Sequence, residues 1–182
     1  MNLTEPERQA EYIESYRTFP KELVDHFPKK IPNNWTHISY GSPEYINEWS
    51  STTGLSLEIQ ITSKEKFKRL KNQLGEEAKE IKNSVDSCLL IVDSKKSQNT
   101  INCNSYYPIP QETIFDYDDE NDKWLRLENC EIALLDYKSG IFLESKYLTV
   151  KETLPENWKN GYSKGYAFNN KKQTIMYWLI IW

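Results

Sequence analysis

The chain has 182 residues, of which 38% are hydrophobic, with 12 Tyr, 6 Trp and 6 Phe, and this apolar content excludes a disordered protein. Lys and Arg number 23 and Asp and Glu number 27, which gives a formal net charge of −4 and argues against a general nucleic-acid binder. No apolar run approaches the roughly 18 residues of a membrane-spanning helix. We therefore expect one domain over residues 1–182.

Residues 1–32 predict a helical segment at the start of the chain. Thr4 and Glu7 have the spacing of a capping box, in which the two side chains bond free backbone N–H groups at a helix start. A short helical turn is expected between Pro20 and Pro28, because proline begins helices well but does not fit inside them. Four apolar side chains of the first helix are expected to face the core: Tyr12, Ile13, Tyr16 and Phe19.

Two strands and the longest helix are predicted in the middle of the chain. Residues 35–40 and 55–61 alternate between polar and apolar side chains, which is typical of half-buried strands. Residues 63–84 predict the longest helix, after a second capping-box sequence at Thr62 and Glu65. Its apolar stripe is expected to consist of Phe67, Leu70, Leu74, Ala78, Ile81 and Val85. A short helix after Ser42-Pro43 is expected to bury Tyr45, Ile46 and Trp49.

The second half of the chain predicts mainly strands. Residues 88–92 are a continuous apolar run, as in a strand buried on both faces. Residues 94–122 are expected to be an irregular, partly acidic connector with a short strand at 99–104. Residues 174–182 are apolar on both faces, so we expect a central strand rather than one that meets a partner. Further strands are expected at 124–127, 131–137, 141–144 and 162–168.

Two hairpins are expected among these strands, one turning at Lys138-Ser139-Gly140 and one at residues 169–172. Helices fall mostly early in the chain and strands mostly late. This order predicts an α+β fold in which a largely antiparallel sheet packs against the long helix at 63–84, with short N-terminal helices beside it.

The three cysteines, Cys88, Cys103 and Cys130, have no metal-binding spacing. One disulfide plus a free thiol is an alternative, but we favour three buried thiols because free cysteines are often buried. The two histidines, His26 and His37, lie in different segments without the spacing of metal ligands. No metal site and no cofactor are expected.

An acidic run is the first candidate binding surface, and it contains Asp116, Asp118, Asp119, Glu120 and Asp122. Alternating carboxylates in one loop suit a hard cation. However, the glycine and glutamate that define a calcium-binding EF-hand loop are missing, so no metal is assigned. The alternative is a solvated acidic turn.

The basic start of the long helix is the second candidate, through Lys64, Lys68 and Arg69. Cations at a helix N-terminus oppose the helix dipole. An arrangement that is locally unfavourable suggests a surface selected for an anionic partner. The alternative is a solvated face neutralised by nearby acidic residues.

No catalytic motif is present: the sequence has no GxSxG elbow, phosphate-binding loop, GxGxxG or HExxH. We assign no catalytic residue. Gly161 and Gly165 have GxxxG spacing, but in a polar setting where the membrane-helix meaning does not apply.

These observations favour a small, acidic, non-catalytic binding protein that recognises another protein, like an inhibitor or immunity protein. An alternative is a secreted or lipid-anchored binder of a small ligand or carbohydrate, which predicts an aromatic-lined pocket. An enzyme whose site only the fold assembles is a further alternative. Met1 precedes no signal-like segment. The protein is thus expected in the cytoplasm if Met1 is the native start, and in the periplasm or at the surface if a leader was removed.

Overall fold

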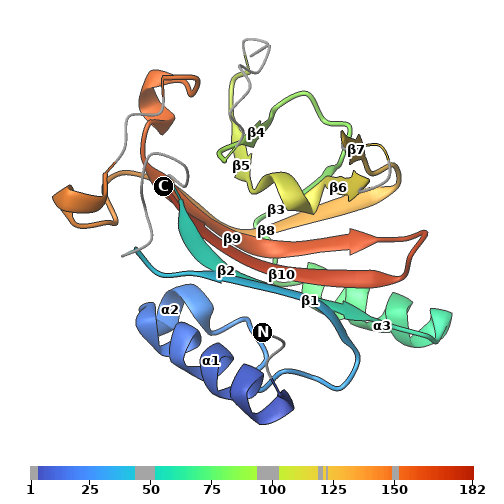
Figure 1. Ribbon diagram of the computed structural model, residues 1–182. Helices are drawn as coiled ribbons and strands as arrows, with labels where there is room; N and C mark the ends of the chain where they lie inside the picture. Colours follow the sequence, from blue (N-terminus) through green and yellow to red (C-terminus); the bar gives the residue numbers. More distant parts are fainter. Residues whose placement is uncertain (1–3, 44–51, 94–102, 119–120, 122, 149–151) are drawn as a thin grey trace.

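A six-stranded antiparallel sheet runs through the centre of the computed structural model, which describes residues 4–43, 52–93, 103–118, 121, 123–148 and 152–182. The sheet separates a helical layer from a layer of short strands and loops (Figure 1), so the chain has an α+β fold, as predicted. In spatial order the strands are β1 (Trp35–Gly41), β2 (Thr53–Gln60), β10 (Thr174–Ile181), β9 (Gly161–Asn169), β8 (Cys130–Ser139) and β3 (Glu80–Asn83).

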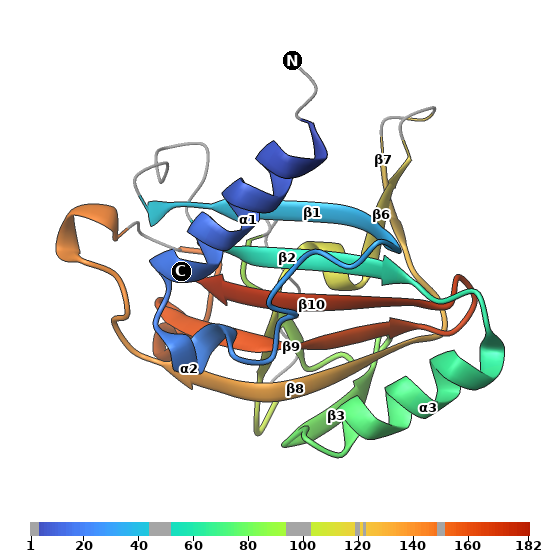
Figure 2. The same cartoon turned by 90° about the horizontal axis from the view of Figure 1, so that it is seen from below.

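The helical layer covers one face of the sheet (Figure 2) and consists of α1 (Glu5–Thr18), α2 (Lys21–Val24) and α3 (Lys64–Gly75). The predicted capping box begins α1, since both the backbone N–H and the hydroxyl of Thr4 donate to the Glu7 carboxylate, at 2.8 and 2.7 Å. Tyr12 is fully buried, and its hydroxyl donates to the carbonyl of Pro28 at 2.5 Å. No described helix is long and apolar enough to cross a membrane.

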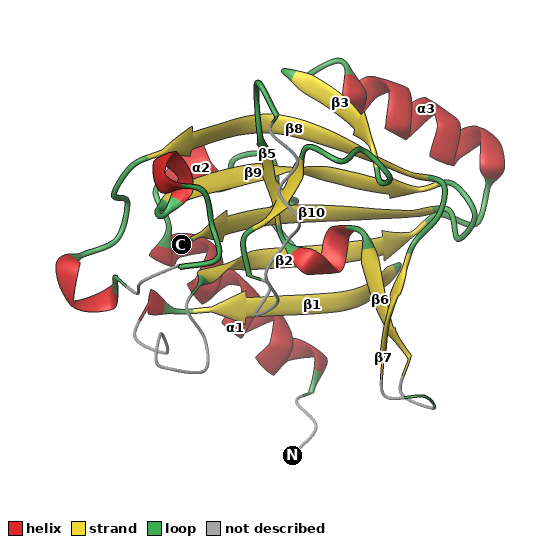
Figure 3. Cartoon of the chain, turned by 90° about the horizontal axis from the view of Figure 1, so that it is seen from above, coloured by secondary structure: helices red, strands yellow, loops and turns green. Residues whose placement is uncertain are grey.

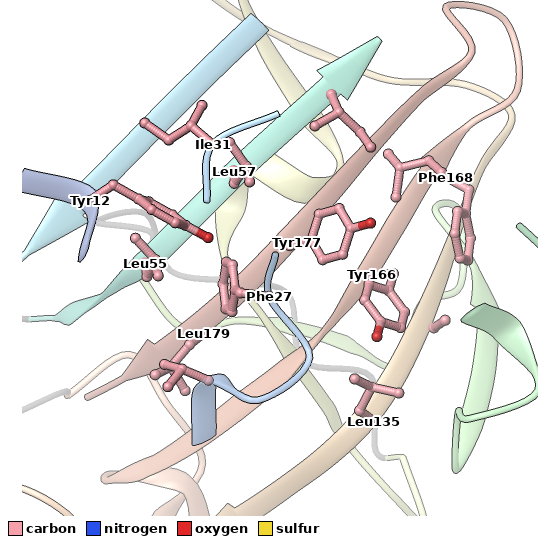
Figure 4. Close-up of a cluster of buried hydrophobic side chains, with 14 of the residues drawn as sticks. Tyr12, Phe27, Ile31, Leu55, Leu57, Leu135, Tyr166, Phe168, Tyr177 and Leu179 are labelled. Carbon is pink, nitrogen blue, oxygen red and sulfur yellow. The ribbon is translucent and has the colours of Figure 1, made fainter. Parts of the chain in front are cut away.

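The main core lies between this helical layer and the sheet (Figure 4). Alternate residues of the central strands point into it, as the period of two along a strand requires. The helical layer contributes Tyr12 and Phe27, and the strands contribute Leu55, Leu57, Tyr166, Phe168, Tyr177 and Leu179.

The opposite face of the sheet carries the second layer (Figure 3). It contains two small sheets, one parallel and one antiparallel, and several single-turn 3-10 helices. In chain order these are β4 (Leu89–Ile91), β5 (Tyr107–Ile109), η2 (Gln111–Thr113), β6 (Phe115–Asp118), β7 (Lys123–Arg126), η3 (Ser145–Tyr147) and η4 (Glu156–Trp158).

The last strand is central, as predicted: β10 lies between β2 and β9, and all its residues are buried. On the face toward the second layer it carries Trp178, and Trp182 follows its end; both are almost fully buried. The neighbouring strand leaves room for these rings, because a Cβ at Gly165 would lie 2.7 Å from the Trp178 ring and one at Gly161 2.8 Å from the Trp182 ring. The two glycines of the GxxxG spacing therefore leave room for these rings on the face of the sheet that carries the second layer.

The predicted long helix is wrong in its second half. Helix α3 begins one residue late, with the Ser63 hydroxyl accepting from the Lys66 N–H at 3.2 Å, and it ends at Gly75 instead of residue 84. Residues 80–83 pair with β8 as the edge strand β3. Pairing to an existing sheet edge replaces the helical hydrogen bonds, and it leaves Ile81 53% and Val85 65% exposed.

Two strand predictions also need correction. Residues 141–144 form no strand, and no hairpin turns at Lys138-Ser139-Gly140, because β8 continues to Ser139 and pairs with β9 instead. Residues 89–91 do form a strand, but it pairs with β5 in the second layer. The expected helix at 43–49 and most of the expected strand at 99–104 lie outside the described residues.

The cysteine prediction was wrong as well. Cys88 and Cys103 form a disulfide, with their Cα atoms 5.8 Å apart, and only Cys130 is a buried free thiol. The reason is tertiary: β4 and β5 pair in parallel register, with Leu89 opposite Tyr107. This pairing brings together two cysteines that are 15 residues apart in sequence.

Candidate functional site

The structure describes only part of the predicted acidic surface. Asp116 lies on β6, is exposed, and accepts a hydrogen bond from Lys172 Nζ. Asp118 ends β6, and its side chain is outside the described part of the structure; Asp119 and Asp122 lie outside the described residues altogether. One of the four predicted carboxylates is therefore engaged within the protein itself.

Asp116 and Asp118 belong to a two-stranded arm, defined here as the antiparallel pair β6 and β7. The arm is anchored where it leaves the sheet: the Arg126 Nε donates to the Ser84 carbonyl at 3.1 Å, and the guanidinium lies 5.8 Å from the centre of the Phe115 ring. Farther out, Tyr117 is 42% and Leu125 43% exposed. Tyr117 pairs with Trp124 and Leu125 with Asp116, so the two exposed apolar side chains lie on opposite faces of the arm.

The predicted basic residues Lys64, Lys68 and Arg69 are all exposed on α3. The next basic residue of this helix, Lys71, instead donates to Glu131 and to Asn170 Oδ1. Asn170 lies in the β9–β10 turn, which also contains the Lys172 that binds the arm. The two predicted surfaces thus flank the same turn from opposite layers of the fold (Figure 1) and are not brought together into one site.

A polar cavity of about 430 Å³ opens on the helical side of the sheet. The hydrogen bonds and the ion pair around this cavity were not predicted from the sequence. Asp136 accepts from the Tyr162 hydroxyl and from Lys79 Nζ, each at 2.5 Å, Lys164 Nζ lies 3.1 Å from Asp25, and the Tyr166 hydroxyl donates to Glu77 at 3.2 Å. The cavity is lined by Asp25, His26, Glu77, Lys79, Leu135, Asp136 and Lys164.

The hydrogen bonds of this network set its charges. Burial by itself raises the pKa of Asp136, but the hydrogen bonds from Lys79 and Tyr162 outweigh it and lower that pKa below its usual value. Burial and the neighbouring Asp136 raise the pKa of Tyr162 to about 12. Asp136 is therefore ionised and Tyr162 neutral at pH 7, which suits binding of a polar group more than proton transfer.

His26 is the buried titratable group of this cavity. Its Nε2 lies 3.0 Å from the Trp178 carbonyl and must be the protonated nitrogen, because a carbonyl oxygen only accepts. Its Nδ1 is buried and has no partner among the described residues. Burial lowers the pKa of His26 to about 4, so the imidazole is neutral at pH 7.

We expect His26 to make folding pH-dependent. The unfolded imidazole takes up a proton near pH 6.5, but the folded one stays neutral until about pH 4. Stability is thus lost as the pH falls through this window, by roughly 2–3 kcal/mol at pH 4. Urea unfolding from pH 7.5 to 4 should show a shallower loss for His26→Gln, with exposed His37→Gln as the control. Equal pH profiles for His26→Gln and the wild type would contradict the assignment.

An aromatic cavity of about 400 Å³ opens on the other face of the sheet, between η4 and the segment before β5. Tyr137 and Trp158 line it with ring centres 6.2 Å apart, and Tyr137 also makes an edge contact with Tyr107 at 6.1 Å. The full lining is Cys103, Asn104, Ser105, Tyr106, Tyr137, Pro155, Glu156, Asn157 and Trp158.

A β-bulge in β8 positions residues of both cavities. The register of β8 against β9 shifts between Leu134 and Asp136. Leu135 and Asp136 therefore both line the polar cavity, while Tyr137 lies on the opposite face among the residues of the aromatic cavity. With strict alternation, Asp136 would lie on the face of the aromatic cavity and Tyr137 on the face of the polar cavity. Residues 132–135 are a continuous apolar run, so no alternation in the sequence marked the position of the bulge.

A third, smaller cavity of about 250 Å³ lies where η2 meets β1 and β2, with Asp93 and Glu112 in its lining. Burial raises the pKa of Glu112, although the Ser56 hydroxyl and His37, whose Nε2 is 3.9 Å away, both act to lower it. Across the described part of the chain, no three His, Cys, Asp or Glu side chains are grouped so as to hold a metal ion.

Comparisons with known proteins identify no relative. No family model, no curated protein and no solved structure matches the chain. Its function is therefore inferred from its own surfaces and cavities.

Proposed function

We propose that the protein is a binding protein that recognises another protein by inserting its β6–β7 arm into a cleft of that partner. The observation that carries the proposal is the pair of exposed apolar side chains, Tyr117 and Leu125, on opposite faces of the arm. One exposed apolar side chain on each face of the ribbon allows contact with two walls of a cleft, whereas a flat contact would cover only one face.

The charge of the arm indicates the chemistry of the partner. Between β6 and β7 the sequence continues the run Asp116 to Asp122, which holds five acidic residues. The partner's cleft is accordingly expected to be apolar on its walls and basic where it meets the acidic run. Opposite charges of this kind accelerate encounter and exclude wrong partners. An acidic chain of this size that fills a basic cleft would act as an inhibitor or an immunity protein does.

The anchoring of the arm supports this role. An isolated two-stranded ribbon is marginally stable in water, and here Arg126 and Lys172 tie it to Ser84 and to the β9–β10 turn. Holding the arm in one orientation reduces the entropy lost on binding.

The test is affinity capture from the protein's own organism with three tagged forms of the full chain. The wild type and Ile141→Ser, which removes an exposed aliphatic side chain beyond the end of β8 that is opposite to the arm, are expected to capture the same stoichiometric partner. Leu125→Ser is expected to bind that partner at least tenfold more weakly. Replacing Asp116, Asp118, Asp119 and Asp122 with Asn is expected to reduce the salt dependence of binding.

Two results would overturn the proposal: a partner that Leu125→Ser holds as tightly as the wild type, or no stoichiometric partner. A partner that needs Lys64, Lys68 and Arg69 but not the arm would assign recognition to α3 instead.

A further inference from the structure

The aromatic cavity combines two kinds of side chain that small polar ligands need together. Rings of Tyr106, Tyr137 and Trp158 provide apolar faces in its lining. Amide side chains of Asn104 and Asn157 lie beside them and are exposed. The carboxylate of Glu156 and the hydroxyl of Ser105 complete the polar lining.

We propose that this cavity binds a carbohydrate, with a pyranose ring stacked on the Trp158–Tyr137 platform. One face of a pyranose presents axial C–H groups, which pack on the electron-rich face of an aromatic ring. Its edge carries hydroxyl groups, which both donate and accept hydrogen bonds; the amides of this lining also do both, and the carboxylate accepts. A cavity of about 400 Å³ lies within the ~300–1,000 Å³ range of small-ligand sites, with room for a mono- or disaccharide.

The walls of the cavity are held in place before a ligand arrives. Trp158 stacks on Trp182 with ring centres 6.2 Å apart, and its carbonyl accepts the Trp182 indole N–H at 2.9 Å. The Cys88–Cys103 disulfide fixes the opposite wall, which begins at Cys103. Walls that are already ordered lose little entropy on binding.

The disulfide also agrees with a glycan as the ligand. Disulfides persist mainly in secreted and cell-surface proteins, which is where glycans are displayed. Glycan binding at this cavity does not depend on the arm, because no residue of the arm belongs to the cavity lining.

The test is saturation-transfer NMR on the full, oxidised chain. The probes are the α- and β-methyl glycosides of glucose, galactose, mannose and N-acetylglucosamine, and tetramethylammonium as a cationic probe of aromatic cages. At about 10 mM, tenfold above a millimolar dissociation constant, at least one glycoside is expected to receive saturation, strongest at its axial C–H protons.

Two variants locate the binding. Trp158→Ala is expected to lower the affinity for the glycoside about tenfold through loss of the stacked ring. Trp158 also supports Trp182, so the exposed Asn157→Ala is the second variant, and it is expected to weaken binding severalfold without a change in thermal stability. The matched control is Asn72→Ala, at an exposed amide on α3, which is expected to bind as the wild type does.

Three results would overturn the proposal: no glycoside receiving saturation, saturation of tetramethylammonium alone, or glycoside binding that neither Trp158→Ala nor Asn157→Ala weakens. Leu125→Ser is expected to leave glycoside binding unchanged, so a failure here is separate from a failure of the arm to bind a protein.

Discussion

Trp178→Ala is expected to lower the free energy of unfolding by about 3–5 kcal/mol. The indole is completely buried between β9 and the second layer. Its ring fills the space left by Gly165, where a side chain would collide with it. Because the neighbouring strands are held in register by backbone hydrogen bonds, they cannot collapse into the resulting cavity. The change is measurable by urea unfolding.

Trp178→Phe separates this packing effect from polarity. The Trp178 Nε1–H is buried without an acceptor among the described residues, so phenylalanine removes an unpaired donor as well as volume. We expect this variant to lose less than about 2 kcal/mol. Trp35→Ala, at a partly buried ring on the edge strand β1, is the control for loss of an indole. If Trp178→Ala lowers the free energy of unfolding by no more than Trp35→Ala does, the result contradicts the packing described for the second layer.

Opening the Cys88–Cys103 disulfide is expected to destabilise the protein by about 3 kcal/mol, as for a loop of roughly 15 residues. The bridge restricts the unfolded chain, and without it the segment that forms β5 must be ordered from a larger ensemble. Guanidinium unfolding with and without reductant measures the effect. The double variant Cys88→Ala/Cys103→Ala should match the reduced wild type and show no response to reductant.

Cys130→Ala is the control for this experiment, because Cys130 is a free thiol buried in the protein. Burial raises the pKa of this thiol to about 11, so it is unreactive at neutral pH. Cys130→Ala should therefore keep the full response to reductant. If reductant leaves the stability of the wild type unchanged, the disulfide assignment is contradicted, and the result supports three buried thiols instead.

Several elements were predicted correctly from local signals in the sequence. The start of α1 depends on Thr4 and Glu7, three residues apart, and the β9–β10 turn depends on Asn169, whose side chain accepts from the N–H groups of Lys171 and Lys172. Alternation in residues 55–61 and apolar character on both faces of residues 174–182 predicted β2 and the central strand β10. In each case the residues that decide the structure are neighbours in the chain.

The candidate sites were less accessible to prediction from the sequence. The aromatic-lined pocket was expected only as a consequence of a carbohydrate-binding function, without any assigned residue. Its lining comes from three separate segments, at 103–106, 137 and 155–158. The polar cavity likewise joins the segments after α2 and after α3 with β8 and β9. Side chains this far apart carry no common spacing that a sequence pattern can reveal.

By itself the sequence determined the α+β class, the helical start, the central strand and its hairpin, because short-range periodicity and capping decide them. Only the tertiary structure decided where α3 ends, which cysteines pair and which way Asp136 and Tyr137 point. Each of these depends on competition for a sheet edge or on strand register. Residues 80–83 match a helix in their apolar spacing, but the edge of β8 offers their backbone hydrogen-bond partners along one side, and long-range pairing prevails over local preference.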